Sequence, residues 1–332
     1  MRAVVVIPTF NARDLLAEAV ASVESQTVPV DVVVVDNAST DGTPELLAAG
    51  FPRVTVVRND ENLGFGRAVN AGVAAAADAD ALVLVNNDAV CAPDFVESLL
   101  ARFADPSVGM VAGVLLQGDA PERIDSAGIE LDTTLGSWDY LWNQPVGALG
   151  AARDPVGPCG GAAAYRFPVF RELGGFDETL FAYWEDVDLA LRFREAGWRC
   201  ALAASARALH KHGQTLGAAS PAARRLEAFG RGYVLAKYRV GRRSLLRRAK
   251  IAVLDWPVLA VHLVVRREAA PIRERRRARS YGLRGPAHRT PLELATVPFR
   301  TALRRQADLL RLRLSGTLPA HFTVERRAYS GD

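Results

Sequence analysis

Two groups of polar side chains in this sequence have the types and positions that chemistry requires. The first follows Ala81–Val85, an apolar run of strand length that ends abruptly in Asn86-Asn87-Asp88. A run without polar alternation predicts a strand buried on both faces, as in a parallel sheet. Open α/β sheets bind ligands at the carboxyl ends of their strands, where one carboxylate flanked by amides can hold a hard divalent cation together with substrate phosphates. The competing interpretation is a plain strand-to-helix turn, because Asn and Asp favour turns.

The second group is the acidic pair Glu185-Asp186, which follows Tyr183 and Trp184 and opens a predicted helix over residues 186–196. Acidic side chains at a helix N-terminus are favoured by the helix dipole and need no catalytic reason. A carboxylate beside two aromatic rings is partly desolvated, however, and desolvation makes it a better base. The pair is therefore a candidate proton acceptor.

The elements before these groups must bring them to one place. Apolar strands are expected at residues 4–7, 31–35, 54–57 and 81–85, with helices beginning near Asp14, Glu45 and Ala68. Strands that alternate with helices and end in polar clusters predict a doubly wound α/β layer with those clusters on one edge. No G-x-G-x-x-G follows the first strand and no Walker A sequence is present. We therefore expect a metal ion and Arg67 to bind the phosphates of a ligand.

Four successive stretches carry a resemblance to a known family: Pro8-Thr9-Phe10-Asn11, VVDNASTDGT, ENLGFGRAVN and NNDAV. They are similar to the signatures of family 2 glycosyltransferases with a GT-A fold. Over residues 3–215 the chain resembles the rhamnosyltransferase-like enzymes of bacterial polysaccharide and cell-wall assembly. The resemblance implies metal-dependent transfer of a sugar from a dTDP- or UDP-activated donor to a hydroxyl of a glycan or lipid-linked glycan. Rhamnose is the sugar that the subgroup favours, while other hexoses and galactofuranose stay open.

The resemblance also implies roles for individual residues. Asp186 matches the general base, which predicts a single displacement with inversion, and Glu185 matches an acceptor-binding residue or substitute base. Asp88 is implied as a ligand of Mg²⁺ or Mn²⁺, although Asn86 stands at the first acidic position of that motif. The H-x-x-G-x-T spacing selects His210 over His212 to complete the metal site. Donor contacts are expected at Pro8, Thr9, Asn11, Asp36, Asn62, Gly64, Arg67, Asn86 and Asn87, and acceptor contacts at Trp184, Gly160 and Gly161.

The net charge of +4 conceals two regions of opposite sign. From Arg239 onward there are 22 basic and 7 acidic residues, whereas residues 1–238 hold 19 basic and 30 acidic ones. Basic clusters also bracket the apolar run Ile251–Val265, which is typical of a helix lying on an anionic membrane surface. A helical hairpin packed on the catalytic domain ranks second. Nucleic-acid binding ranks last, because interleaved aromatic residues and a known module are missing.

We therefore expect a GT-A catalytic domain over residues 1–215 and a basic, mostly helical region over 216–332. Three widely spaced cysteines predict a reducing compartment, and the amino-terminal apolar run is too short for a signal peptide, so the expected location is the cytoplasmic face of the membrane. The aromatics Trp138, Tyr140 and Trp142 alternate as on one face of a β-hairpin, although they could also stack on a sugar. A non-catalytic nucleotide-sugar-binding or membrane-surface scaffold is the alternative function. A nucleotidyltransferase is disfavoured, because no Gly/Arg/Lys-rich loop follows the first strand.

Overall fold

The protein is described here by a computed structural model. The residues that it describes are 1–211, 220–240, 244–284, 288 and 292–315. They form two compact units, which we treat separately. Unit 1 comprises Met1–Ile129, Asp139–Phe181 and Glu185–Thr215, and unit 2 comprises Glu130–Trp138, Ala182–Trp184 and Leu216–Asp332. Two short segments from the first two thirds of the sequence therefore belong with the C-terminal helices.

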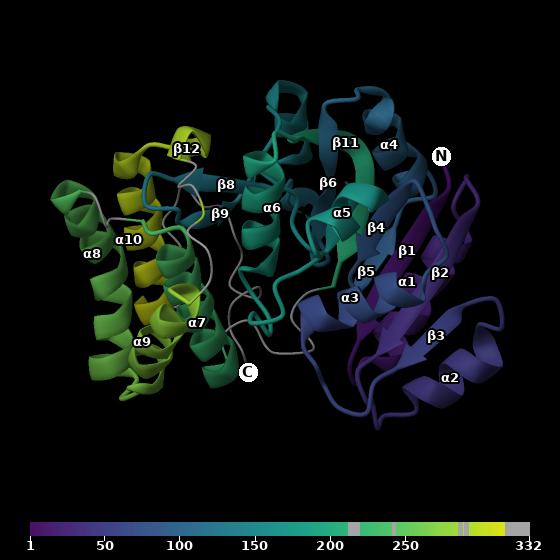
Figure 1. Ribbon diagram of the computed structural model, residues 1–332, viewed down its shortest axis with the longest axis horizontal. Coiled ribbons are helices and arrows are strands. Elements are labelled where there is room, and N and C mark those ends of the chain that lie inside the picture. Colours follow the sequence, from purple (N-terminus) through teal and green to yellow (C-terminus); the bar gives the residue numbers. More distant parts are fainter. Residues whose placement is uncertain (212–219, 241–243, 285–287, 289–291, 316–332) are drawn as a thin grey trace. The chain divides into compact units, whose positions relative to one another are not determined.

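A mixed β-sheet forms the centre of unit 1, with the strand order β3-β2-β1-β4-β10-β6-β11-β5 and β7 paired with β6 (Figure 1). Strands β1, β2, β3 and β4 are mutually parallel, as the apolar runs predict, whereas β10 runs antiparallel to both β4 and β6. The bounds are β1 Ala3–Thr9, β2 Val30–Asp36, β3 Thr55–Arg58, β4 Ala81–Val85, β5 Ala89–Cys91, β6 Val108–Gln117, β7 Ala120–Ser126, β10 Ala162–Arg166 and β11 Arg199–His210.

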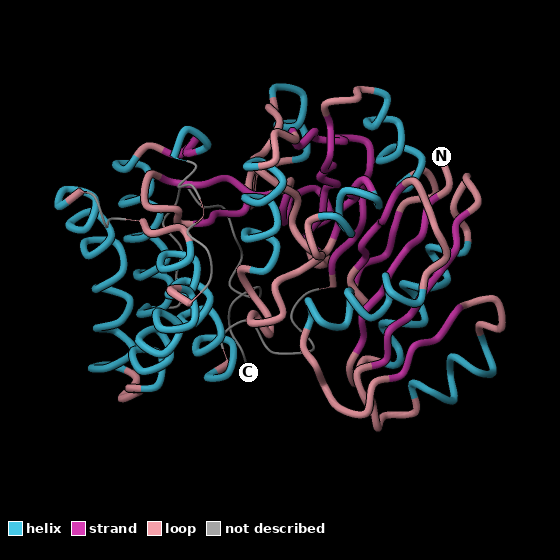
Figure 2. The backbone as a smooth tube through the Cα atoms, viewed as in Figure 1, coloured by secondary structure: helices cyan, strands magenta, loops and turns pink. Residues whose placement is uncertain are grey.

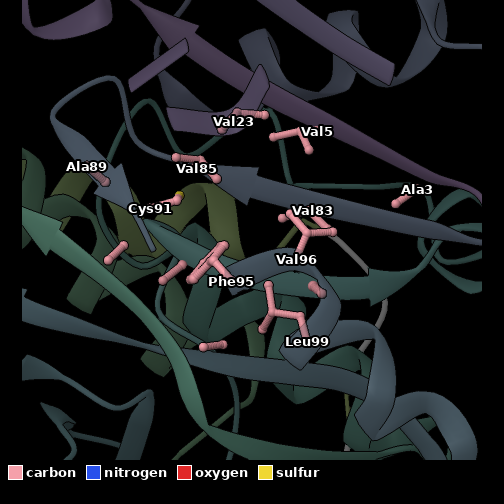
Figure 3. Close-up of a cluster of buried hydrophobic side chains, with 14 of the residues drawn as sticks. Ala3, Val5, Val23, Val83, Val85, Ala89, Cys91, Phe95, Val96 and Leu99 are labelled. Atoms are coloured by element: carbon pink, nitrogen blue, oxygen red, sulfur yellow. The ribbon is translucent and has the colours of Figure 1, made fainter. Parts of the chain in front are cut away.

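Alternate residues of the central strands pack on opposite faces of this sheet, which explains why the strands are apolar throughout. On β1, Val5 faces one buried cluster and Val6 faces the other. Figure 3 shows the first cluster, in which Phe95 and Leu99 lie against strand residues. Helices cover both faces (Figure 2), as a doubly wound layer requires. They are α1 Arg13–Glu24, α2 Thr43–Gly50 and α4 Phe95–Ala101 on one face, and α3 Phe65–Ala75, α5 Phe167–Glu172 and α6 Glu185–Glu195 on the other.

Unit 2 combines helices with a small sheet of order β12-β8-β9. Its helices are α7 Pro221–Lys237, α8 Leu245–Ala260, α9 Ala270–Gly282 and α10 Phe299–Ser315, and its strands are β8 Ile129–Asp132, β9 Ser137–Asp139 and β12 Ala295–Val297. Ser220 and Ser244 cap α7 and α8, since each hydroxyl accepts a backbone N–H three residues on. Helix α8 continues through a π-helical turn over Val261–Val265. None of the helices in the described ranges has the length and hydrophobicity needed to cross a bilayer.

The aromatic residues 138, 140 and 142 do not share one face. The expected hairpin forms between β8 and β9, but β9 is only three residues long and contains Trp138 alone among them. Trp138 packs against the cluster of Leu254, Val297 and Ala302 in unit 2, whereas Tyr140 is buried in the core of unit 1. The strict alternation in the sequence is broken by Leu141, whose φ of 59° takes the chain out of the strand conformation.

Candidate active site

Polar side chains from three neighbouring strand ends meet at one edge of the sheet in unit 1. Thr9 lies opposite Asp36 in the β1–β2 register, and the Asn87 side-chain amide donates to the Thr9 hydroxyl over 3.0 Å. Asp36 is fully buried, and its Oδ1 accepts the Ser39 N–H at 2.9 Å. Its Oδ2 has no hydrogen-bond partner among the described residues, and Arg58 Nε lies 3.8 Å away. Burying a carboxylate oxygen without a hydrogen-bond donor costs free energy. Asp36 Oδ2 is therefore suited to accept an N–H from the ring of a bound ligand.

The loops after β1 and β2 are tied to each other. Pro8 lies within β1 opposite Val35. Asn11 has a left-handed φ of 48°, its N–H donates to Ser39 Oγ at 2.9 Å, and its Oδ1 accepts the Thr40 N–H at 2.8 Å. These bonds satisfy the backbone N–H groups of Asn11 and Thr40, which follow the ends of β1 and β2. They also hold in place the two loops next to Asp36.

The loop before α3 is fixed against the segment that precedes the acidic pair. Gly64 donates its N–H to Asn62 Oδ1 at 3.0 Å, and Phe65 donates its N–H to the Phe181 carbonyl at 2.8 Å. Gly64 has a φ of +83°, and a Cβ added there would lie 2.2 Å from the Phe181 oxygen. Only glycine fits this position, because both the conformation and the space exclude a side chain.

Arg67 lies on α3 with its guanidinium at the surface. Its Nε is 3.3 Å from the Glu178 carbonyl oxygen and 3.6 Å from Glu178 Oε2. Both side chains are about half exposed, at 47% and 59%, so this pair contributes little to stability. Arg67 can therefore turn towards a phosphate at small cost.

Asp88 and His210 form the candidate metal site with a third residue that the sequence did not indicate. His210, at the end of β11, places Nε2 3.1 Å from Asp88 Oδ1 and Nδ1 2.7 Å from Asp125 Oδ2. Asp125 lies on β7 where the β6–β7 register is irregular, so no repeating sequence pattern could have identified it. A carboxylate on the second ring nitrogen orients a metal-binding histidine and selects its tautomer. His212 lies outside the described residues.

The contact between Asp88 and His210 fits a cation. Burial lowers the pKa of His210, but the hydrogen bonds and charges of Asp125 and Asp88 outweigh it and raise the pKa to about 10. If the ring proton points from Nδ1 to Asp125, the Nε2 lone pair faces the Asp88 carboxylate, and a proton or a metal ion must lie there. Two neighbouring ligands of an octahedral ion with bonds of about 2.1 Å stand about 3 Å apart. Among the described residues, no group of three His, Cys, Asp or Glu side chains could hold one ion. Substrate phosphates and water can complete the coordination of a divalent cation.

The acidic pair Glu185-Asp186 lies at the start of α6. Asp186 Oδ1 accepts the Val187 N–H at 2.7 Å and Oδ2 accepts the Gly160 N–H at 3.3 Å. Glu185 is buried, and its Oε2 has no hydrogen-bond partner within the described ranges. Burial raises the pKa of both carboxyls, and the charge of Asp186 raises the pKa of Glu185 further, whereas the backbone donors to Asp186 work against the shift there. The pair therefore ionises first at Asp186. Asp188 is structural, since its buried carboxylate pairs with Arg192 at 2.8 Å.

Gly160 and Gly161 link the Asn86-Asn87-Asp88 motif to the candidate base Asp186. The Asn86 N–H donates to the Gly161 carbonyl at 3.3 Å, while the preceding Gly160 N–H reaches Asp186. The metal motif and the candidate base thus lie on either side of two adjacent residues of unit 1. Such an arrangement can hold a diphosphate leaving group on one side and receive a proton on the other.

Trp184 is placed differently from the other candidates. It belongs to unit 2 and has a left-handed φ of 74°. The guanidinium of Arg231 lies 5.5 Å from the centre of its ring.

Several known proteins are similar to this chain in sequence. The family model described as Glycosyl transferase family 2 matches residues 4–174. The N-acetylglucosaminyl-diphospho-decaprenol L-rhamnosyltransferase of Mycobacterium tuberculosis is 31% identical over 241 residues, which cover 64% of this chain and 77% of that protein. The O-antigen chain rhamnosyltransferase RfbN of Salmonella typhimurium is 29% identical over 221 residues, covering 65% of this chain and 68% of the relative.

A solved structure shows the same fold. The mannosyltransferase PcManGT from Pyrobaculum calidifontis, in complex with GDP-Man and Mn²⁺, has a TM-score of 0.55 and 22% identity, covering 95% of this chain and 86% of the other. The fold is GT-A, as the sequence predicts. The family model spans more than half of the chain, and its range includes the strand ends and the metal motif described above. The chain belongs to glycosyl transferase family 2.

Proposed function

We propose that this glycosyltransferase moves a sugar, with rhamnose as the first candidate, from a nucleoside-diphosphate donor to a hydroxyl of a lipid-linked glycan, with inversion and with help from a divalent cation. One observation carries the proposal. Within one compact unit, the Asn86-Asn87-Asp88 motif bonds Gly161 through the Asn86 N–H, Asp186 accepts the Gly160 N–H, and Asp88 contacts His210.

The nucleotide site is proposed at the edge of the sheet. Asp36 Oδ2, buried and without a donor in the described part of the chain, would accept the ring N–H of a uracil or thymine base. Thr9 and the Asn11 loop would wall the same space. Arg67 would leave its exposed partner Glu178 and contact the donor's ribose or phosphates. Both dTDP and UDP offer the ring N–H that this site requires.

Asp88 and His210 would hold Mg²⁺ or Mn²⁺, and the ion supplies positive charge against the nucleoside diphosphate that leaves. The solved relatives PcManGT and GalNAc-T7 each contain Mn²⁺ together with a nucleotide or nucleotide-sugar. Asp125 would keep the His210 ring turned towards the ion through its 2.7 Å hydrogen bond.

Asp186 would act as the base. Its carboxylate accepts two backbone N–H groups, which favours the ionised form, and Asp186 is less buried than Glu185. It takes the proton of the acceptor hydroxyl while that oxygen attacks the anomeric carbon from the face opposite the diphosphate. One displacement of this kind inverts the configuration at that carbon. Glu185, buried and protonated, would hydrogen-bond the acceptor.

The acceptor and the membrane are proposed together. The Mycobacterium tuberculosis relative carries a diphospho-decaprenol acceptor in its name, and such a lipid is confined to a membrane. On unit 2 we define the α8 stripe as the exposed apolar side chains Leu245, Leu246, Val253, Trp256, Leu263, Val264 and Val265. Exposed Arg248 and Arg267 flank it, which suits an anionic bilayer.

The test is turnover of dTDP-rhamnose and, in parallel, of UDP-hexoses with a short-chain GlcNAc-diphospho-polyprenol in the presence of Mn²⁺. The proposal expects a product whose anomeric configuration is opposite to that of the donor, read from the NMR coupling of the anomeric carbon and proton. A product that retains the donor configuration would exclude the single displacement. Release of nucleoside diphosphate that is independent of Asp186 would exclude its role as the base.

A further inference from the structure

The segment directly before the acidic pair is strained. Tyr183 and Trp184 both adopt left-handed backbone conformations, with φ values of 68° and 74°. This conformation costs free energy for any residue other than glycine, so two such residues in a row persist only where the surroundings hold them. Both residues belong to unit 2, whereas Glu185, the next residue, begins α6 in unit 1.

Helix α7 supplies what holds this turn. At Gly230 an added Cβ would lie 2.5 Å from Cδ1 of Trp184, so the helix backbone approaches the indole as closely as glycine allows. The neighbouring Arg231 is buried, and its guanidinium lies 5.5 Å from the centre of the same ring. A guanidinium over an indole at this distance is an attractive cation–π contact.

Arg231 is itself fixed by every arm of its guanidinium. Nη1 donates to the Thr134 carbonyl and Nη2 to the Thr134 hydroxyl, each over 2.9 Å. Nε lies 3.4 Å from Asp255 Oδ1 on α8. A planar group with donors committed in three directions has little freedom to rotate. The ring that it covers is therefore held by a rigid partner.

We propose that Arg231, together with Gly230, is a positioning residue: it fixes the Tyr183–Trp184 turn, which Glu185 and Asp186 follow directly in the chain, and so limits the motion of the backbone that carries the base. The inference rests on the proposed role of Asp186 as the base. Displacing a catalytic base by about 1 Å can lower the reaction rate by about 100-fold.

The chain contains a matched control for this proposal. Arg275 on α9 pairs with the other oxygen of the same Asp255 carboxylate and is also mostly buried. No contact joins Arg275 to Trp184 among those found in the described residues. Counting partners among the described residues, Arg231→Met and Arg275→Met each leave Asp255 with one arginine, so both remove one charge from the same ion network. Only the first removes a contact with the turn.

The experiment is amide hydrogen exchange of the full-length protein, read on peptides that cover residues 182–187, without any ligand. We expect exchange there to become at least about 10-fold faster in Arg231→Met and in Gly230→Ala, with Arg275→Met close to the parent protein. Gly230→Ala provides a second variant if Arg231→Met folds poorly. Equal acceleration in the Arg275→Met protein, or unchanged exchange at 182–187 in both α7 variants, would overturn the proposal.

A second arm measures product formation in the Mn²⁺ assay with the GlcNAc-diphospho-polyprenol probe. Arg231→Met should lower kcat by about 10–100-fold while dTDP binding by calorimetry stays unchanged. In a Trp184→Ala background the same substitution should have little further effect, because its route to the base is already lost. A full additional loss in that background would show that Arg231 acts by another path. If the parent protein makes no product, the proposed function fails, while the exchange experiment still decides the positioning role.

Discussion

Glu185 and Asp186 place two carboxyl groups side by side where water has little access. Burial raises the pKa of Glu185 from 4.5 to about 8, and it raises that of Asp186 as well. The folded protein therefore binds a proton at Glu185 that the unfolded chain releases at lower pH. Stability linked to this group is fully present below pH 4.5 and is lost as the pH rises towards 8.

Replacing Glu185 with Gln should therefore stabilise the protein at alkaline pH. The expected gain in Tm is at least about 2–4 °C at pH 9 and close to zero at pH 5, because the amide never has to ionise. Differential scanning calorimetry of both proteins at the two pH values measures this. An equal change at pH 5 and pH 9 would show that Glu185 does not titrate in this window.

Asp186→Asn should remove the base without disturbing the donor site. We expect kcat to fall by about 100-fold to 10,000-fold, the usual contribution of general base catalysis, while nucleotide affinity stays nearly unchanged. Initial rates with the proposed donor and acceptor, and calorimetric titration with the nucleotide, separate the two effects. Collapse of nucleotide binding in the variant would contradict the assignment of Asp186.

Asp125→Asn should weaken the metal site through His210. Partners on the second nitrogen of a ligating histidine typically change metal affinity by about 10-fold to 100-fold. Titration of Mn²⁺ by electron paramagnetic resonance, in the presence of dTDP, reads the affinity without turnover. Asp119→Asn is the matched control, since Asp119 is exposed on the turn between β6 and β7. Equal Mn²⁺ affinity in both variants would show that Asp125 has no part in the site.

At the level of single residues, sequence reasoning selected candidates that stand in a local motif and gave no signal for residues defined by pairing. Asp88, Asp186 and His210 each follow or open an element in a recognisable pattern, and the structure brings Asp88 to His210 and Asp186 to Gly160. Asp125 has no such pattern, because its partner is 85 residues away. Arg231 likewise looked like one basic residue among many.

Among the elements, α8 combines a buried and an exposed apolar side. Leu254 is buried and Asp255 pairs with Arg231 inside unit 2. In contrast, Trp256 is 59% exposed and Val264, in the following π-turn, is 73% exposed. Exposed apolar side chains that recur along one helix face, with arginines at its ends, are typical of a helix that lies in a membrane interface.

Replacing Trp256 and Val264 together with Ser should reduce membrane binding through the α8 stripe. We expect about a 10-fold or larger loss in partitioning to vesicles of phosphatidylglycerol and phosphatidylcholine, because two large apolar side chains no longer enter the interface. Sedimentation with the vesicles measures the bound fraction. Val56→Ser, at an exposed apolar position in unit 1, is the control and should bind like the parent.

Three other outcomes of that experiment would change the role assigned to the α8 stripe or to the arginines beside it. Equal binding by the double variant would show that the stripe is not the contact. Binding that is the same for purely neutral vesicles and insensitive to salt would remove the role of Arg248 and Arg267, because attraction to anionic lipids is screened by salt. A change in oligomeric state of the double variant would instead assign the stripe to a second copy of the chain.

The elements that the sequence predicted well are those whose apolar pattern is dictated by burial on both sides. The runs at β1, β2 and β4 could only be central parallel strands, and the structure buries them fully apart from the first residues of β2. Strand β10, with the sequence AAAYR, lacks a pattern that would fix its antiparallel direction between β4 and β6. Strand β11 extends to His210 because its second half pairs with both β5 and β6, and these pairings are not marked in the local sequence.

At the scale of the whole molecule, much of the positive charge in unit 2 has an internal use. Arg224 pairs with Glu268, Arg275 with Asp255 and Arg305 with Glu130. The sequence could count the excess of arginine but could not divide it between structure and surface, since that division depends on which helices meet. The exposed arginines of α8 and α9 carry the part that remains for an anionic partner.

We propose that unit 1 binds a nucleoside diphosphate through Asp36 and through a cation held by Asp88 and His210. The most direct measurement is a thermal-shift panel of UDP, dTDP and GDP, each with and without Mn²⁺, because a ligand that binds only the folded protein raises its midpoint. We expect a Mn²⁺-dependent rise with UDP or dTDP that disappears in Asp88→Ala, and a smaller rise with GDP. No shift with any nucleotide, or an equal shift in the Asp88→Ala protein, would contradict the account.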